Sequence, residues 1–265
     1  MQKKVKLGVI GGGFMANAIV KGAIETNYLK AEEILVSEPE ESRRAQFLAM
    51  GCNVCCDNVF VASRCEYLLL AIKPQVFPEI ASGLQSVELP VVISIMGGRT
   101  KSGICKASGA KKVARIMPNL PCSVGSGMAG VDVSSLSEQE KEFVCGLFSS
   151  VGEVAIVEEE LLNAVTGISG SGPAYVYLFY RSLVQAGMAQ GMSEELAEKL
   201  SLQTIAGGVE MLKTSNKTPD ELIAAVSSKG GTTIAALNSF EKDDFSGSVM
   251  RAVDAAVRRA EELSE

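Results

Sequence analysis

A glycine-rich turn near the start of the chain holds the first residues whose types and spacing point to chemistry. The turn consists of Gly11, Gly12, Gly13, Phe14, Met15 and Ala16. Gly11, Gly13 and Ala16 fit the pattern G-x-G-x-x-G/A, in which the first residue permits a tight turn, the second lets a pyrophosphate approach the backbone, and the third lets a helix lie close to a strand. The apolar residues 5–10 predict a buried parallel strand before the turn. Together these features predict a dinucleotide site with the pyrophosphate bound at a helix N-terminus.

The helix expected after the turn separates this interpretation from that of a flexible glycine hinge. Its apolar residues recur at helical spacing without an intervening proline, at Ala16, Ile19, Val20, Ala23 and Ile24. A helix that begins directly after the glycines directs its free N–H groups and the positive end of its dipole toward a phosphate. We therefore favour the dinucleotide site over the hinge.

The end of the second expected strand carries groups that distinguish the two nicotinamide cofactors. In sites of this kind an acidic residue bonds the ribose 2′-hydroxyl of NADH, whereas an arginine accepts the 2′-phosphate of NADPH. The sequence offers both, with Glu38 at the strand tip and Arg43 and Arg44 in the following helix. The two arginines also fit an ordinary solvated helix face. Glu38 favours NADH, and NADPH stays open as the cofactor.

Two further glycine-rich segments, residues 169–175 and 227–233, place small residues and exposed backbone N–H groups ahead of helices. Such an arrangement can hold an anion. The first segment fits a tight helix junction as well as it fits a ligand contact. The second ends in Gly230, Gly231, Thr232 and Thr233. Its two hydroxyl groups add to the backbone amides, so this segment predicts a carboxylate cradle with a hydrogen-bond donor beside it.

The chain contains no histidine, which excludes Ser-His-Asp and Cys-His triads and every histidine-ligated metal site. Its seven cysteines are odd in number and scattered, as expected for reduced thiols. Cys52, Cys55 and Cys56, with Cys65 nearby, fit a zinc or redox element, but no second close pair of cysteines follows. We instead expect Cys52 and Cys56 to face one side of a strand together with Val54, and we expect no metal site.

Length and composition indicate a globular chain of about two domains, at the usual ~150 residues per domain. Its 265 residues are 47% hydrophobic, which is ample for packed cores. A net charge of -6, with lysines and arginines scattered among carboxylates, argues against a nucleic-acid partner or an anionic membrane surface. No apolar run approaches the ~20 residues of a membrane span, and the N-terminus shows no signal-peptide cleavage pattern. We therefore expect a cytoplasmic protein that acts on small molecules.

Short apolar runs alternate with helical segments through the first 158 residues. Strands are expected at 5–10, 33–38, 52–56, 66–72, 89–95, 112–116, 129–133 and 153–157. Helices are expected between most of them, including one opened by Asp57 and one opened by the capping box of Ser137 and Glu140. This alternation predicts an α/β fold with a doubly wound, mostly parallel sheet, in a dinucleotide-binding domain spanning residues 1–158.

No further strand is expected in residues 159–265, which predict an all-helical second domain. Its helices are expected at about 159–168, 173–191, 193–213, 218–227 and 246–263. Alanine and glycine are frequent on their apolar faces, and apolar character extends over more than one face. Such helices pack more comfortably against a second copy than alone. We expect an obligate dimer or larger assembly, with a self-contained bundle as the alternative.

Five motifs, in order along nearly the whole chain, together resemble pyrroline-5-carboxylate reductase. They are residues 11–16, 71–75, 115–119, 164–175 and 230–233. The resemblance implies a Rossmann domain followed by a helical substrate-binding and dimerisation domain that interlocks with a partner, in dimers that often assemble into decamers. It also implies reduction of the cyclic imine 1-pyrroline-5-carboxylate to L-proline with NADPH or NADH, the final step of proline biosynthesis.

The resemblance further implies roles for individual residues. The pyrophosphate would bind at residues 11–16. Other cofactor contacts are implied at Ser37, Asn58, Ile72, Lys73 and Pro74, and near the nicotinamide at Met117, Pro118 and Asn119. The substrate carboxylate would bind the amides from Gly230 to Thr233, and the Thr233 hydroxyl would bond the ring nitrogen. One departure is Lys229, where the family usually has proline.

Hydride transfer from nicotinamide C4 to the imine carbon depends on positioning more than on acid–base groups, and it is easiest when the ring nitrogen is protonated. The lack of histidine is therefore compatible with this chemistry. Thr233 is better understood as an orienting group that can relay a proton, because an unassisted hydroxyl has a poorly matched pKa. Two alternatives are a β-hydroxyacid-type dehydrogenase with a lysine base and a non-catalytic NAD(P)H-binding sensor.

Overall fold

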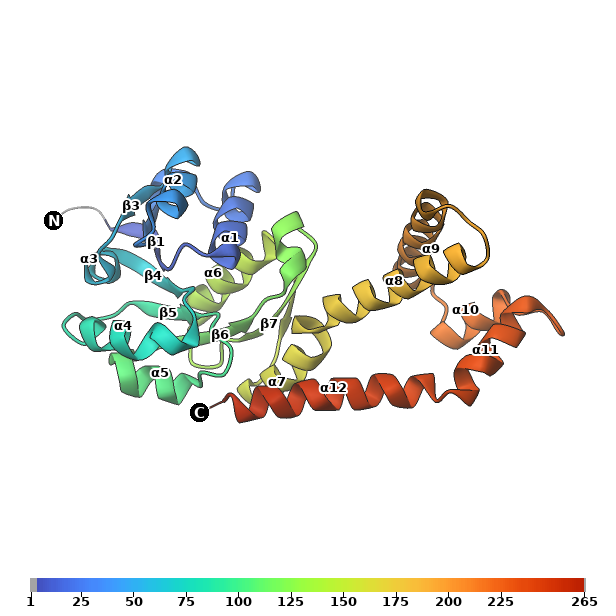
Figure 1. Ribbon diagram of the computed structural model, residues 1–265. Coiled ribbons are helices and arrows are strands. Elements are labelled where there is room, and N and C mark those ends of the chain that lie inside the picture. The colour runs from blue at the N-terminus through green and yellow to red at the C-terminus, as the bar shows by residue number, and fades with distance from the viewer. Residues whose placement is uncertain (1–3, 265) are drawn as a thin grey trace. The chain divides into compact units, whose positions relative to one another are not determined.

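A computed structural model describes residues 4–264, and its contacts divide the chain into two compact units (Figure 1). The first unit comprises residues 4–171 together with 255–264, and the second comprises residues 172–254. The domain boundary predicted from the sequence lies between residues 158 and 159. Residues 159–171 join the first unit because helix α7 (Leu162–Val165) contacts strands β6 and β7 of its sheet.

The first unit is built on an eight-stranded sheet in the order β3-β2-β1-β4-β5-β6-β7-β8. The strands are β1 (Val5–Ile10), β2 (Ile34–Ser37), β3 (Asn53–Cys55), β4 (Cys65–Leu70), β5 (Val91–Ser94), β6 (Val113–Met117), β7 (Gly127–Asp132) and β8 (Gly152–Ile156). Among these described strands, all neighbouring pairs are parallel except β6 and β7. The predicted doubly wound, mostly parallel sheet is confirmed.

Helices cover both faces of this sheet (Figure 1). One face packs against α1 (Phe14–Glu25), α2 (Glu41–Ala49) and α6 (Glu138–Ser149), and the other against α3 (Asn58–Ser63), α4 (Phe77–Leu84) and α5 (Lys101–Ser108). Side chains alternate between the two cores along each strand. Leu69 therefore belongs to the first core, whereas its neighbours Leu68 and Leu70 belong to the second.

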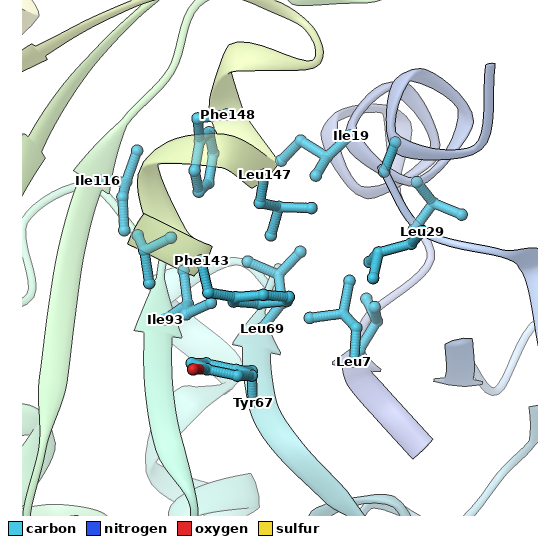
Figure 2. Packing of buried hydrophobic residues seen from close by; sticks show 14 of the residues in the cluster. Leu7, Ile19, Leu29, Tyr67, Leu69, Ile93, Ile116, Phe143, Leu147 and Phe148 are labelled. Atoms are coloured by element: carbon cyan, nitrogen blue, oxygen red, sulfur yellow. The ribbon is translucent and has the colours of Figure 1, made fainter. Parts of the chain in front are cut away.

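The first core anchors α1 and α6 on the strands that lead to the glycine-rich turn. Figure 2 shows Ile19 of α1 and Leu147 of α6 over the sheet residues Leu7 and Leu69. Below them the rings of Tyr67 and Phe143 stack, with centroids 3.8 Å apart and planes 19° apart. Each fully buried leucine or isoleucine contributes roughly 1.5–3 kcal/mol relative to an exposed one. The start of α1 is thus held at the end of β1.

Short helical segments complete the first unit. They are the 3₁₀ turns η1 (Ala31–Glu33), η2 (Pro74–Val76), η3 (Leu120–Val124) and η4 (Glu159–Leu161) and a π-helical turn, η5 (Thr166–Gly170). Helix α5 was not expected, because its sequence contains few apolar residues and only Ile104 and Ser108 are buried within it. Its two ends nevertheless carry signals: Thr100 caps the Gly103 N–H at 3.1 Å, and Gly109 ends the helix at φ 77°.

The second unit contains helices only, as predicted. They are α8 (Gly172–Ala189), α9 (Glu194–Thr214), α10 (Pro219–Ala225), α11 (Thr232–Lys242) and the first half of α12 (Phe245–Glu262). The expected helices closely match these bounds, except that α11 was not predicted. Thr218 opens α10 with the predicted capping box, since its side chain and that of Glu221 bond each other's backbone N–H groups.

Apolar side chains on these helices are largely exposed. Among the described residues of this unit, only Val184, Ala197 and Ser201 are buried. Exposed side chains include Val176, Tyr177, Leu178, Phe179, Leu200, Leu202, Met211, Leu212, Phe240, Phe245 and Met250. An exposed apolar surface of this extent is typical of a protein interface. None of the helices within residues 4–264 combines the length and apolar character needed to cross a bilayer.

Candidate functional site

The glycine-rich turn adopts a backbone that requires its first glycine. Gly11 follows β1 at φ 93°, where side chains are disfavoured, and its N–H donates to the Ser37 carbonyl at 2.9 Å. A Cβ atom at Gly11 would also lie 2.7 Å from the carbonyl oxygen of Ala71. The turn therefore brings the ends of β1, β2 and β4 together, with glycine as the residue that fits.

The start of α1 is open to an anion. Gly13 is its N-cap, and no side chain among the described residues caps it. A Cβ atom at Gly13 would meet no described heavy atom within 4 Å, so the space beside this backbone is free. The first turn contains no acidic residue, and its N–H groups lack partners within the helix. This cradle fits the pyrophosphate of a dinucleotide.

Glu38 lies beside that cradle, directly after β2. Its carboxylate accepts two backbone N–H groups, from Gly12 at 2.6 Å and from Glu40 at 2.9 Å. The residue is 4% exposed. Arg44 donates to the carbonyl oxygens of Glu38 and Pro39, at 2.7 and 2.5 Å. Glu38 is therefore held facing the glycine-rich turn.

Two other predicted cofactor contacts meet at the ends of β2 and β3. The Ser37 hydroxyl donates to the side-chain oxygen of Asn58 at 2.6 Å. Asn58 is the first residue of α3, and Asp57 caps that helix by accepting the Phe60 N–H at 2.9 Å. The sequence indicated both residues separately, and the structure brings them together.

The loop after β4 lies next to the glycine-rich turn. The Ala71 N–H donates to the Ile10 carbonyl at 2.9 Å, which places Ile72, Lys73 and Pro74 directly beyond the sheet edge. Lys73 is exposed. Arg99, which was not predicted as a site residue, donates to the Pro74 carbonyl at 3.3 Å and adds a cation to this loop. Arg99 follows two glycines beyond the end of β5, and this position was the sequence signal that could have indicated a site residue.

The segment after β6 contacts the π-helical turn. Met117 ends the strand, and Pro118 and Asn119 are buried. The Asn119 amide donates to the backbone and hydroxyl oxygens of Ser169, at 3.2 and 3.3 Å, and accepts the Met128 N–H at 2.9 Å. Its side chain thus joins two motifs that are 50 residues apart. The start of the first glycine-rich segment thus belongs to a π-turn, a feature that is frequent at functional sites.

A buried ionic network supports the same edge of the sheet. Arg115 contacts Glu159 at 3.3 Å, and that carboxylate accepts the Lys101 N–H at 2.7 Å. Lys101 also pairs with Asp132. Burial raises the pKa of Asp132. Lys101 and the hydrogen bonds from Ser134 lower this pKa by a larger amount, so the net shift is downward. These charges are paired within the fold, and we assign them a structural role.

The predicted carboxylate cradle of the second unit is a tight turn followed by a helix. The Gly231 N–H donates to the Ser228 carbonyl at 2.9 Å, and Gly230 has φ 73°, as at the third position of a type II turn. Lys229 is exposed. Gly231 is the N-cap of α11, which has no acidic residue in its first turn and no side-chain cap from the part of the chain described. Thr232 and Thr233 therefore lie in a helix start that fits an anion.

The cysteine-rich strand contains no metal cluster. No group of three His, Cys, Asp or Glu side chains within residues 4–264 is arranged to hold a metal ion. Cys52 and Val54 pack against the first core as predicted, but Cys56 is exposed because β3 ends at Cys55. Burial raises the pKa of Cys52 to about 11 and that of Cys65 to about 12, which favours the protonated thiol at neutral pH.

Comparisons with known proteins place this arrangement in a family. Residues 159–263 match a family model described as pyrroline-5-carboxylate reductase dimerisation, and residues 6–98 match one described as NADP oxidoreductase coenzyme F420-dependent. The pyrroline-5-carboxylate reductase of Synechocystis sp. is 39% identical over 98% of this chain and 99% of its own length.

Solved structures agree with this match. The pyrroline-5-carboxylate reductase of Coxiella burnetii is similar at a TM-score of 0.91 and 31% identity, covering 99% of this chain and 100% of that one. The Plasmodium falciparum pyrroline carboxylate reductase, solved with NADP bound, has a TM-score of 0.87 and 32% identity over 100% of both chains. The resemblance carried by the five motifs is confirmed, and the chain belongs to the pyrroline-5-carboxylate reductase family.

Proposed function

We propose that the chain reduces 1-pyrroline-5-carboxylate to L-proline with a hydride from NAD(P)H, the last step of proline biosynthesis. The observation that carries the proposal is the open start of α1, where an uncapped helix follows a glycine turn with free space beside Gly13. Membership of the reductase family over nearly the whole chain supports the choice of substrate.

The residues of the first unit that hold the cofactor are proposed from their places around the glycine turn. The N–H groups of Gly13, Phe14, Met15 and Ala16 surround the proposed pyrophosphate position, after the bend at Gly11, while the Gly12 N–H is bonded to Glu38. Ser37, Glu38 and Asn58 border the ribose, while Ile72, Lys73 and Pro74 line the other side of the turn. Met117, Pro118 and Asn119 are placed near the nicotinamide, with Asn119 positioning the segment through its bonds to Ser169 and Met128. Bound NAD(P)H supplies the hydride.

The start of α11 is the proposed substrate subsite. The substrate carboxylate accepts the N–H groups of Gly230, Thr232 and Thr233, while the Gly231 N–H closes the turn onto Ser228 and the helix dipole favours an anion. The Thr233 hydroxyl bonds the ring nitrogen and keeps the imine carbon oriented for attack. No strong acid is needed because a protonated imine is already electrophilic. Thr233 thus acts by orientation and proton relay.

The proposed assembly is a homodimer that associates further into a decamer. Support comes from the dimerisation family match over residues 159–263 and from the exposed apolar side chains of the second unit. We place the protein in the cytoplasm without nucleic-acid or membrane partners, since all seven cysteines are free and the net charge is -6. Light scattering coupled to size exclusion would measure the number of copies.

Cofactor oxidation in the presence of 1-pyrroline-5-carboxylate tests the proposed reaction. We expect turnover of NADH or NADPH with this imine, and the six-membered imine is assayed in parallel. Oxidation of 3-hydroxyisobutyrate-like acids without reduction of either imine would contradict the proposal and favour a β-hydroxyacid dehydrogenase. Tight cofactor binding without turnover of any of these substrates would favour a sensor.

The Thr233 hydroxyl provides a sharper test of the subsite. Thr233→Val keeps the branched shape and removes the hydroxyl, and Thr233→Ala removes both. Each is expected to lower kcat/KM for the imine by roughly ten- to a thousandfold. Thr233→Ser keeps the hydroxyl and should retain most activity. Equal kinetics for the wild type and the valine variant would remove Thr233 from the site.

A further inference from the structure

We infer that this chain selects NADH over NADPH and that the Glu38 carboxylate makes the selection. The inference rests on the proposed function and specifies its cofactor. Its basis is the environment of the β2–α2 turn, where the sequence alone left Glu38 and the two arginines as competing determinants.

The position of Glu38 suits a ribose with a free 2′-hydroxyl. Its carboxylate accepts the N–H of Gly12, within the phosphate-binding turn, at 2.6 Å, and the N–H of Glu40 at 2.9 Å. An ionised carboxylate has about four acceptor sites, so roughly two stay available for hydroxyl donors. A ribose attached to a pyrophosphate on α1 lies beside Gly12 in sites of this kind. The 2′-hydroxyl can then donate to Glu38.

A 2′-phosphate would instead meet negative charge. The N-terminus of α2 is the helix end that could hold it, yet the N–H of Glu40 is already bonded to Glu38, and Glu41 lies in the first turn. Residues 38–44 contain three glutamates and two arginines, a net charge of -1. The anion expected at this helix end is thus supplied by the chain itself.

The two arginines are directed toward their own turn. Arg44 donates to the carbonyl oxygens of Glu38 and Pro39, and Arg43 pairs with Glu40 at 2.9 Å. Both Arg44 bonds use Nη1 and the Arg43 pair uses Nε, so each side chain is held against its own turn. A 2′-phosphate on NADPH would approach the buried Glu38 carboxylate, while both arginines are held at oxygen atoms of this turn. Discrimination therefore combines an attractive contact with one cofactor and a repulsive contact with the other.

The kinetic test compares both cofactors at saturating 1-pyrroline-5-carboxylate in the wild type and in Glu38→Gln. We expect wild-type kcat/KM to be about tenfold or more higher for NADH than for NADPH, and the glutamine variant to shift that ratio roughly a hundredfold toward NADPH. The matched control is Glu41→Gln, which removes the same charge from the same helix end without touching Gly12. We expect that control to change the ratio less than about threefold.

A binding test separates this inference from the proposed reaction. Adenosine 5′-diphosphate and its 2′-phosphorylated analogue are titrated against wild-type protein, with displacement of bound NADH fluorescence as the readout. Tighter binding of the unphosphorylated nucleotide supports the inference even if no imine is turned over, and it also supports the inference if Glu38→Gln unfolds. Tighter binding of the 2′-phosphorylated analogue, a wild-type preference for NADPH, or a wild-type preference for NADH that Glu38→Gln leaves unchanged would overturn it.

Discussion

The N-termini of α1 and α2 follow neighbouring parallel strands, but only the N-terminus of α1 is open to an anion. At α1 the cap is Gly13, no described side chain bonds the first turn, and no acidic residue lies in it. At α2 Glu38 bonds the first free N–H, and Glu41 lies in the first turn. Both helix ends carry the positive end of the dipole and N–H groups that have no partner within the helix. The comparison shows that the placement of acidic side chains decides whether a helix end is left for a ligand.

The start of α11 resembles α1 rather than α2. Its cap is Gly231, its first turn carries hydroxyls instead of carboxylates, and no side chain of the described residues caps it. We propose that these two open ends bind the two anions of the reaction, a pyrophosphate and a substrate carboxylate. An acidic side chain introduced at either end should therefore hinder anion binding there, as the glutamates do at α2.

Gly13→Asp should have the largest effect, because it places a carboxylate at the open end of α1. We expect affinity for both NADH and NADPH to fall about 1,000-fold, equivalent to roughly 4 kcal/mol of repulsion from a diphosphate at an effective dielectric constant near 20. Fluorescence titration of each cofactor measures this loss. The fold should survive, since the site of the new Cβ is open and aspartate is a good N-cap.

Gly13→Asn is the matched control for that substitution. It adds the same bulk without charge, and blocking the close backbone approach alone should weaken binding about tenfold. Equal losses in the two variants would mean that space, rather than charge, governs this helix end.

Thr232→Asp makes the corresponding change at α11. We expect KM for 1-pyrroline-5-carboxylate to rise about a hundredfold through repulsion of its carboxylate, while the dissociation constant of NADH is unchanged. Steady-state kinetics and cofactor titration on the same preparation measure the two quantities. Thr232→Asn serves as the neutral control, and a rise in KM of the same size in both variants would argue against an anion at this position.

Arg44→Gln examines the closed end of α2. Because Arg44 is bonded to the carbonyl groups of its own turn, its removal should change the NADH-to-NADPH ratio of kcat/KM less than about threefold. Parallel assays with both cofactors give this ratio. A tenfold loss of kcat/KM for NADPH alone would show that Arg44 binds a 2′-phosphate. The N-terminus of α2 would then be open to an anion.

Lys229→Pro should have the smallest effect, at the turn that precedes α11. Proline is favoured at the second position of a type II turn, and Gly230 at φ 73° occupies the third. We expect stabilisation of about 0.5 kcal/mol by reduced freedom of the unfolded chain, which is roughly 1–2 °C in Tm. Differential scanning calorimetry measures it against Lys229→Gln. A lower Tm for the proline variant would mean that this turn needs the lysine backbone N–H.

The sequence predicted the sheet because its signals are local. Alternating apolar runs and helix caps identified every strand of the sheet, and the five motifs identified the family. Helix α5 was not predicted because its sequence is weakly apolar and contains Gly103 within the helix. Packing of Ile104 on the sheet stabilises it. The division at residue 171 also depends on contacts of α7 that no local pattern encodes.

Site residues were predicted by type, whereas their partners depend on register. Glu38 meets Gly12 because β1 and β2 pair with Ile10 opposite Ser37, a contact across 26 residues of sequence. The bond from Asn119 to Ser169 spans 50 residues in the same way. Spacing indicated that an acid and two arginines compete at the ribose end, but only the folded chain shows which of them faces the turn.

A crystal structure of the protein with NADH bound would test the central contrast between α1 and α2 most directly. We predict the pyrophosphate on the N–H groups at the start of α1 and the ribose 2′-hydroxyl within about 2.7–3.2 Å of the Glu38 carboxylate. A ribose bonded to Arg43 or Arg44 with Glu38 turned away, or a pyrophosphate remote from Gly13, would contradict the account.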